Sequence, residues 1–208
     1  MRQMQAHRGR GRPRSQTADA AILEAALTLF TQRGFEGASF EAIAEAAGVA
    51  RTTLYRRWTS RAALIAEAIA AGRGAPELEL PAAGLSAADL RDALVEAISQ
   101  TLAAPELRHV IARLVGAAPD HPELMAAYWR AYMAPRRAAI IEVLQRARAE
   151  GLITGGAAGG ADPEILLDLI GGALMHHLLV RPGAPSPAEL KTYLLDVLAA
   201  LGLMEPVT

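Results

Sequence analysis

The sequence predicts an all-α fold in two parts. Of its 208 residues, 52% are hydrophobic and only 4% aromatic, with frequent alanine, which fits a core made of packed helices. Apolar residues recur at helical spacing, Ser, Asp and Pro precede many of these runs, and no stretch alternates as a strand does. A Gly/Pro-rich joint, GRGAPELELPAAG at 72–84, divides the chain. We expect a disordered arm at 1–14, a small domain at 15–72 and a larger helical domain at 73–208.

The small domain begins with two predicted helices that end at glycines. The first has an apolar stripe and ends near Arg33 and Gly34. The second starts after Ser39, whose hydroxyl is a suitable N-cap, and Glu41 suits the positive end of the helix dipole. Its apolar face consists of Phe40, Ile43, Ala44 and Ala47. Gly48 follows at once, and glycine readily takes the left-handed conformation that ends a helix.

The third predicted helix, at 51–58, is polar and basic. Leu54 and Trp58 are four residues apart and are expected to anchor it. Its other side chains can donate hydrogen bonds: Arg51, Thr52, Thr53, Tyr55, Arg56 and Arg57. A fourth helix is capped by Ser60 and runs to Gly72, with four apolar residues pointing inward.

Two short helices joined at a glycine turn, the second of them basic, indicate a helix-turn-helix, which places one helix in the DNA major groove. The alternative is an ordinary solvated helix surface. On the first interpretation, base edges meet Arg51, Thr52 and Thr53. Phosphates meet mostly the side chains of Tyr55, Arg56, Arg57 and Arg61. Trp58, besides anchoring, lies near the DNA backbone, and Ser39 joins the same predicted DNA-binding surface.

This region resembles the tetracycline-repressor (TetR) type of transcriptional regulator, from about residue 17 to 70. The resemblance depends on Gly-Phe at 34–35, Gly-Val at 48–49 and Thr-Leu-Tyr at 53–55. The family usually has Tyr-x-x-Phe followed by a basic residue. Here these positions are Tyr55, Trp58 and Arg61, and Trp is a mild departure. Beyond residue 70 the resemblance is one of architecture only. It implies a homodimeric repressor, released when a small apolar effector in the C-terminal domain shifts the fourth helix and so changes the spacing of the recognition helices. Activation in place of repression stays open.

Charge is distributed unevenly along the chain. Residues 1–73 carry 11 Arg and 6 acidic residues, a net +5, whereas residues 74–208 carry a net −6. A phosphate-binding surface therefore belongs to the N-terminal third. The first 14 residues hold five arginines and no acid. They are either a solubilising tail or an arm that follows the minor groove with Arg10, Arg12 and Arg14.

The larger domain has clear helix starts. Ser86 to Asp89 has capping-box form, and Pro105 begins another helix. A long helix is predicted from Pro122 to about Glu150, kinked by Pro135. The last two helices start at Asp162-Pro163 and at 186–189, Ser-Pro-Ala-Glu.

These last two helices are unusually apolar, the first of them almost all round. We expect them to form a four-helix interface with a second copy, through Leu166, Ile170, Gly171, Leu174, Leu178, Leu194, Leu198 and Leu201. The alternative is a buried helical hairpin inside a monomer. A two-fold dimer would place its recognition helices about 34–36 Å apart on a palindromic operator. The apolar stretch 165–180 is judged too short and too polar for a membrane span, which favours a cytoplasmic protein.

An effector pocket is predicted from the aromatic and Met residues of the long helix and its neighbour: Met125, Tyr128, Trp129, Tyr132, Met133, Met175 and His176. Each of them can equally be a core or interface residue, and control by a protein partner without a ligand is a further alternative. No metal site is expected, because the histidines lack partners at ligand spacing. An enzyme is not expected either, since the chain has no Cys and no catalytic or nucleotide-binding motif.

Overall fold

The computed structural model of the chain describes residues 13–72, 87–149 and 160–203, and every regular element within them is helical, which confirms the predicted fold class. The N-terminal helices are α1 (Pro13–Gly37), α2 (Phe40–Ala46), α3 (Arg51–Arg57) and α4 (Arg61–Gly72). The C-terminal helices are α5 (Ala87–Ala103), α6 (Pro105–Ala117), α7 (Pro122–Tyr128), α8 (Ala134–Ala149), α10 (Pro163–Met175) and α11 (Pro187–Ala200). Two π-helical turns, η1 (Trp129–Met133) and η2 (His176–Val180), follow α7 and α10.

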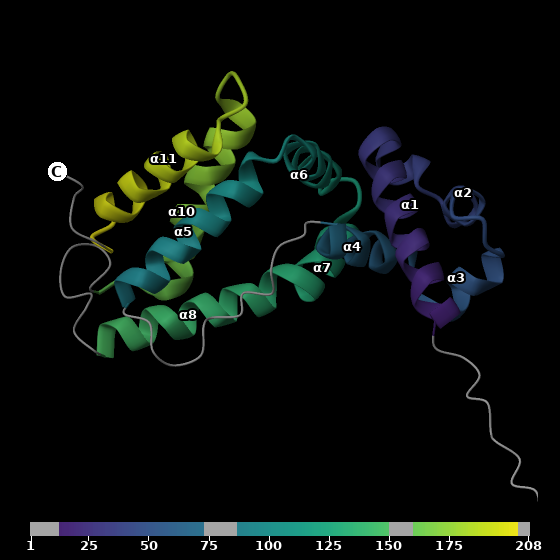
Figure 1. Cartoon of the computed structure of the whole chain (residues 1–208), viewed down its shortest axis with the longest axis horizontal. Coiled ribbons are helices and arrows are strands. Elements are labelled where there is room, and N and C mark those ends of the chain that lie inside the picture. The colour runs from purple at the N-terminus through teal and green to yellow at the C-terminus, as the bar shows by residue number, and fades with distance from the viewer. Residues whose placement is uncertain (1–12, 73–86, 150–159, 204–208) are drawn as a thin grey trace, which may run out of the picture.

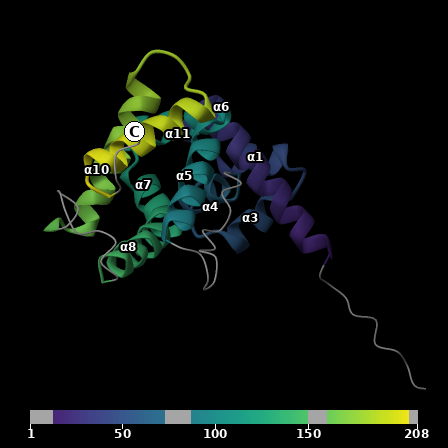
Figure 2. The ribbon, with the colours of Figure 1, turned by 60° about the vertical axis from the view of Figure 1, so that its left-hand side comes forward.

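The helices form an elongated molecule with α1, α2 and α3 at one end (Figure 1). Helix α4 packs against both α1 and α7, so it joins this end to the rest of the chain. At the other end α11 packs along α5, and α10 contacts both α8 and α11. Figure 2, turned by 60°, shows α1 on the opposite side of the molecule from α8 and α10. Helix α3 therefore lies at one end of the molecule.

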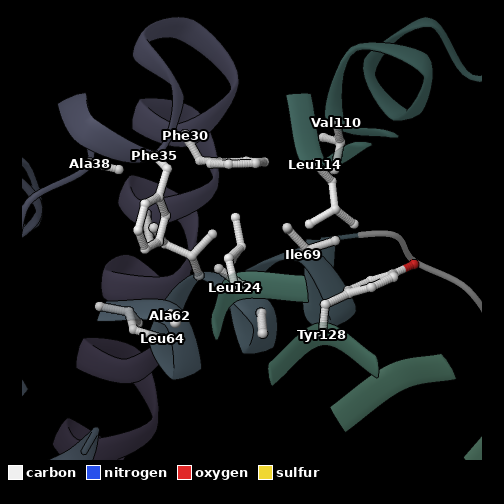
Figure 3. Packing of buried hydrophobic residues seen from close by; sticks show 14 of the residues in the cluster. Phe30, Phe35, Ala38, Ala62, Leu64, Ile69, Val110, Leu114, Leu124 and Tyr128 are labelled. Carbon is white, nitrogen blue, oxygen red and sulfur yellow. The ribbon is translucent and has the colours of Figure 1, made fainter. Parts of the chain in front are cut away.

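One apolar core crosses the predicted domain boundary (Figure 3). Phe30 of α1 and Ile69 of α4 belong to the same buried cluster as Leu124 and Tyr128 of α7 and Leu114 of α6. The joint at 72–84 thus separates two lengths of chain, but the side chains on either side of it pack together.

Most predicted helix ends are found where the local residues require them. Ser39, Ser60 and Ser186 cap α2, α4 and α11 with their hydroxyls, and Ser186 forms the full capping box with Glu189. Asp162 caps α10 through its carboxylate, which accepts from Glu164 N–H at 2.9 Å. The predicted cap at 86 lies outside the described residues.

The first helix differs from prediction at both ends. It begins at Pro13, so the last two residues of the predicted arm are helical. Residues 1–12, and with them Arg10 and Arg12, lie outside the described residues, and Arg14 is described only as backbone in the first turn of α1. At the other end Gly34, with φ of 73°, interrupts the helix where the sequence predicted it to stop, and a short helical segment continues to Gly37.

Pro135 breaks the long C-terminal helix through a π-helical turn. Proline has no N–H to donate, and its ring collides with the carbonyl four residues earlier in a regular helix. The chain widens just before it: Ala134 N–H donates to Trp129 O, five residues back. The regular α-helical hydrogen bonding is therefore interrupted just before Pro135, by η1 between α7 and α8.

Helix α10 and η2 together are longer than the apolar stretch 165–180 recognised in the sequence. They form an 18-residue apolar helix, Pro163–Val180, which by length and composition alone is sufficient to cross a membrane. The argument from its shortness is therefore wrong. Its carboxylates are nevertheless held by protein: Arg137 of α8 pairs with Glu164, and with Asp168 at 3.0 Å.

Candidate nucleic-acid interface

The turn between α2 and α3 has a defined backbone geometry. Gly48 has φ of 65°, and its N–H donates to Glu45 O at 3.1 Å. The next amide, of Val49, donates to Ala44 O at 3.0 Å. These two bonds constitute a Schellman motif, which ends α2 and redirects the chain into α3. Val49 packs partly buried against the core.

Helix α3 is held by the two residues predicted to anchor it. Leu54 is fully buried and Trp58 is 7% exposed. The indole N–H of Trp58 donates to Glu67 Oε2 of α4 at 2.7 Å. Since this donor is already used inside the molecule, Trp58 belongs to the core, and the prediction that it also contacts the DNA backbone is corrected.

The outer face of α3 is open to solvent. Arg51, Thr52, Tyr55 and Arg56 are exposed, and Thr53 is half-buried. Tyr55 remains 58% exposed although its ring makes an edge-to-face contact with Phe40 of α2, at 4.9 Å between ring centroids. This contact fixes a large donor-bearing side chain on the face that also carries Arg51 and Arg56.

Arg51, the first residue of α3, pairs with Glu41 in the first turn of α2. Hydrogen bonding to its own backbone, the charge of Arg51 and the Ser39 hydroxyl together lower the pKa of Glu41. From the sequence, the only role predicted for Glu41 was a favourable interaction between its negative charge and the positive end of the α2 dipole. Its contact with a predicted base-reading residue was missed, because it depends on the angle between α2 and α3.

Two predicted phosphate contacts are engaged in packing instead. Arg57 is half-buried and pairs with Asp19 of α1. Arg61 lies 3.9 Å from the centre of the Phe35 ring and pairs with Glu36 at 3.1 Å. Both arginines therefore hold α3 and α4 against α1. The sequence could not separate them from Arg56, which has the same chemistry and is exposed.

A polar junction connects this end of the molecule to the C-terminal helices. Glu36 Oε1 receives both Arg61 and Nε2 of His121, the latter at 3.2 Å. The His121 ring, at the start of α7, lies 4.5 Å from the Phe35 ring. In addition, Arg113 of α6 donates to the Gln32 carbonyl at 3.5 Å. The C-terminal end of α1 is thus tied to α6 and to the start of α7 as well as to α4.

The predicted effector residues do not all meet. Tyr128 and Tyr132 are buried and stacked at 5.3 Å, and the three methionines Met125, Met133 and Met175 pack partly buried against the same cluster. Trp129 is 44% exposed and His176 is exposed, so these two lie at the surface and apart from the buried tyrosines. A surface hollow of about 510 Å³ is lined by Ala118, Pro122, Met125, Ala126, Trp129 and Arg130, which joins Met125 to Trp129 but excludes the tyrosines. Within the described residues no group of three or more potential metal ligands occurs.

The predicted dimer residues also divide into two sets. Leu166, Leu174, Leu178 and Leu194 are buried inside the subunit, so they are corrected to core positions. Ile170, Gly171, Leu198 and Leu201 are half-buried. The large apolar side chains that α10 and η2 leave exposed are instead Ile165, Leu169 and Val180, at 53%, 50% and 67%. A helix apolar on every side does not reveal in its sequence which face turns inward.

Comparison with known proteins gives a consistent result. Residues 22–68 match the model for bacterial regulatory proteins of the tetR family, and residues 80–197 match that for the tetracyclin repressor-like C-terminal domain. The chain is 30% identical over 171 residues to the uncharacterized HTH-type transcriptional regulator YdeS of Bacillus subtilis strain 168, with 82% of this chain and 83% of that one covered.

Solved structures agree. The TetR family transcription regulator SCO0332 is 29% identical, with a TM-score of 0.60 and coverage of 88% of this chain and 97% of that one. A candidate regulator of Pseudomonas aeruginosa PAO1 shares the fold at 24% identity, with a TM-score of 0.69 and coverage of 93% of each chain. The family matches together span the helix-turn-helix and most of the C-terminal helices. The chain therefore belongs to the TetR family of ligand-responsive, DNA-binding transcriptional regulators, which are not enzymes.

Proposed function

We propose that this protein is a cytoplasmic repressor that binds a palindromic operator as a homodimer and is released by a small apolar effector. The observation that carries the proposal is the exposed face of α3. Arg51, Thr52, Tyr55 and Arg56 lie on that face, while Leu54 on the opposite side is fully buried. A helix anchored in this way can enter the major groove as a rigid unit.

Each exposed side chain has a suitable partner on DNA. Arg51 can make the bidentate contact to guanine O6 and N7, and the methyl of Thr52 can contact that of thymine. Tyr55 and Arg56 can donate to phosphate oxygens. The N-terminal third, with its net +5, attracts the duplex, and in the proposed complex the arginines of residues 1–14 follow the minor groove.

The proposed dimer uses the apolar face that α10 and η2 expose. Ile165 and Leu169 are one helical turn apart, and Gly172 lies on the same side. Neither Gly171 nor Gly172 has a described neighbour within 4 Å of where a Cβ would be, so a second helix can approach closely. Such a face repeated by two-fold symmetry is self-complementary.

Release by an effector is proposed to act through α4. This helix contacts both α7 and η1, which carry the buried Tyr128 and Tyr132, and only three residues separate it from the end of α3. A molecule that separates the tyrosines from their apolar neighbours would displace α4 and therefore α3. One neighbour of the same fold, a candidate regulator of Saccharomonospora viridis, was solved with choline.

Selection of bound sequences from random duplex DNA tests the DNA-binding part. The full-length protein should enrich a palindrome whose half-site centres are about 34–36 Å apart, or a multiple of that spacing. Arg51→Ala should weaken binding to the selected palindrome. Arg130 is an exposed arginine of η1, outside the helix-turn-helix, and Arg130→Ala should leave this binding unchanged. Failure to enrich any sequence at moderate ionic strength would contradict the proposal.

Thermal melting with a library of apolar compounds tests the effector part. A compound that stabilises the protein and also lowers its affinity for the selected operator supports the proposal. If no compound does both, control by a protein partner becomes the better explanation.

A further inference from the structure

The ion pair between Glu41 and Arg51 lies on the exposed side of the helix-turn-helix that is proposed to face DNA, but it contributes little to the folding of this region. Both side chains are well exposed, at 49% for Glu41 and 58% for Arg51. Exposed ion pairs contribute little stability, because water screens the charges and two long side chains must be ordered. The packing of α2 and α3 is already provided by Ile43, Leu54 and Trp58. The main effect of this contact is therefore to orient the guanidinium of Arg51, not to stabilise the fold.

Orientation matters for this particular side chain. Arginine has many rotamers, and ordering it on a base edge has an entropic cost. A bidentate contact to guanine also requires the plane of the guanidinium to be aligned with the base. Glu41 Oε1 holds Nη2 of Arg51, which leaves the other guanidinium N–H groups for the base. The pair thus restricts the guanidinium before DNA arrives.

We propose that Glu41 is a specificity-determining residue, which positions Arg51 so that it discriminates guanine from other bases. The inference rests on the proposed function, since it requires α3 to enter the major groove. It also separates two effects of the carboxylate. Its negative charge near phosphates weakens binding to every sequence alike, whereas its contact with Arg51 affects the preference at only one base pair.

The test uses the ratio of two affinities, which cancels the general charge effect. The first affinity is for the selected operator, and the second is for the same operator with the base read by Arg51 replaced. Arg51→Ala identifies that base, because the ratio falls only at the position that Arg51 reads. Glu41→Gln keeps the size of the side chain but removes its charge, and it should reduce the ratio at the same position by about fivefold.

Glu45→Gln is the matched control. Glu45 is an exposed glutamate of the same helix, one turn further on, so its variant makes the same change in charge. It should raise both affinities similarly and leave the ratio unchanged. Thermal melting should show that both variants are folded at the temperature of the binding assay, with Glu41→Gln melting slightly earlier than the parent because the charged form of Glu41, whose pKa is lowered, stabilises the fold. In an Arg51→Ala background, Glu41→Gln should have no further effect on the ratio.

Two results would overturn the inference. If Glu41→Gln tightens binding and keeps the ratio, the carboxylate merely occupies Arg51 in the free protein. If Glu41→Gln lowers the ratio equally in the Arg51→Ala background, the carboxylate acts independently of Arg51. Failure of the proposed function is distinguishable from both, since then no operator is selected and Arg51→Ala itself changes nothing.

Discussion

Leu169→Glu should dissociate the proposed dimer. Leu169 is 50% exposed, in the middle of the apolar face formed by α10 and η2, and Ile165 lies one turn before it at 53%. In a two-fold interface each substitution occurs twice, once in each subunit. The change in the free energy of dissociation is therefore twice the change caused by one substituted residue.

The size of the effect follows from the exposed fraction. Full burial of a leucine side chain gives about 2 kcal/mol, so the half that is still exposed would give about 1 kcal/mol in each subunit. A glutamate at the same position loses this burial free energy. In addition, removing its carboxylate from water costs at least about 1 kcal/mol in each subunit. Over two subunits the dimer should weaken by about 4 kcal/mol, or roughly a thousandfold in Kd.

Sedimentation velocity across a concentration series measures this change directly. Val115→Glu is the matched control, because Val115 of α6 is also apolar and 48% exposed but lies outside the proposed interface. It should leave the dimer intact. If Leu169→Glu remains dimeric with an unchanged melting temperature, this face is not the interface. The same variant should bind a single half-site of the operator more weakly than the parent dimer binds the palindrome.

Three further predictions concern single residues. Arg56→Ala should weaken binding to all sequences alike and lower the salt slope by about one, with Arg130→Ala as control; a changed base preference would contradict a phosphate role. Gly48→Ala should destabilise the protein by about 1 kcal/mol in chemical unfolding, since its Cβ has open space but φ is 65°. Gly116 is helical and also has open space around it, so Gly116→Ala should instead stabilise the protein. If the two substitutions change the stability equally, the conformational argument is refuted. Glu189 accepts its capping partner's amide and hydroxyl, which lowers its pKa from 4.5. This stabilisation is present above pH 4.5 and is lost as the pH falls through the lowered value, so Glu189→Gln should melt earlier at pH 7, with the difference shrinking in acid. If the difference in melting temperature between Glu189→Gln and the parent protein does not depend on pH, the charged carboxylate is not the source of the stabilisation.

Local signals in the sequence predicted most of the fold. Caps such as Ser39 and Ser186 act within one turn, and Gly48 and Pro135 impose their effects on the adjacent backbone. These interactions need no knowledge of the rest of the molecule. The same holds for the anchoring of α3 by Leu54 four residues before Trp58, since that spacing alone places both on one face.

The roles of individual side chains depended on contacts between distant segments. Arg56 and Arg57 are chemically identical and adjacent, but only Arg57 faces Asp19 of α1. Likewise, α10 has leucines on all sides, and the packing of α8 and α11 decides which of them are buried. Neither outcome is encoded in a local pattern. The helices were therefore predicted correctly from the sequence, but for some of them the buried side was predicted wrongly.

The continuity of the apolar core has a consequence for engineering this protein. Phe30 and Ile69 share their packing with Leu114, Leu124 and Tyr128. A chimaera that joins residues 1–72 to the sensing half of another regulator would therefore leave Phe30 and Ile69 against foreign side chains. Transferring the operator preference of this chain to another scaffold requires carrying the facing residues of α6 and α7 along with the helix-turn-helix.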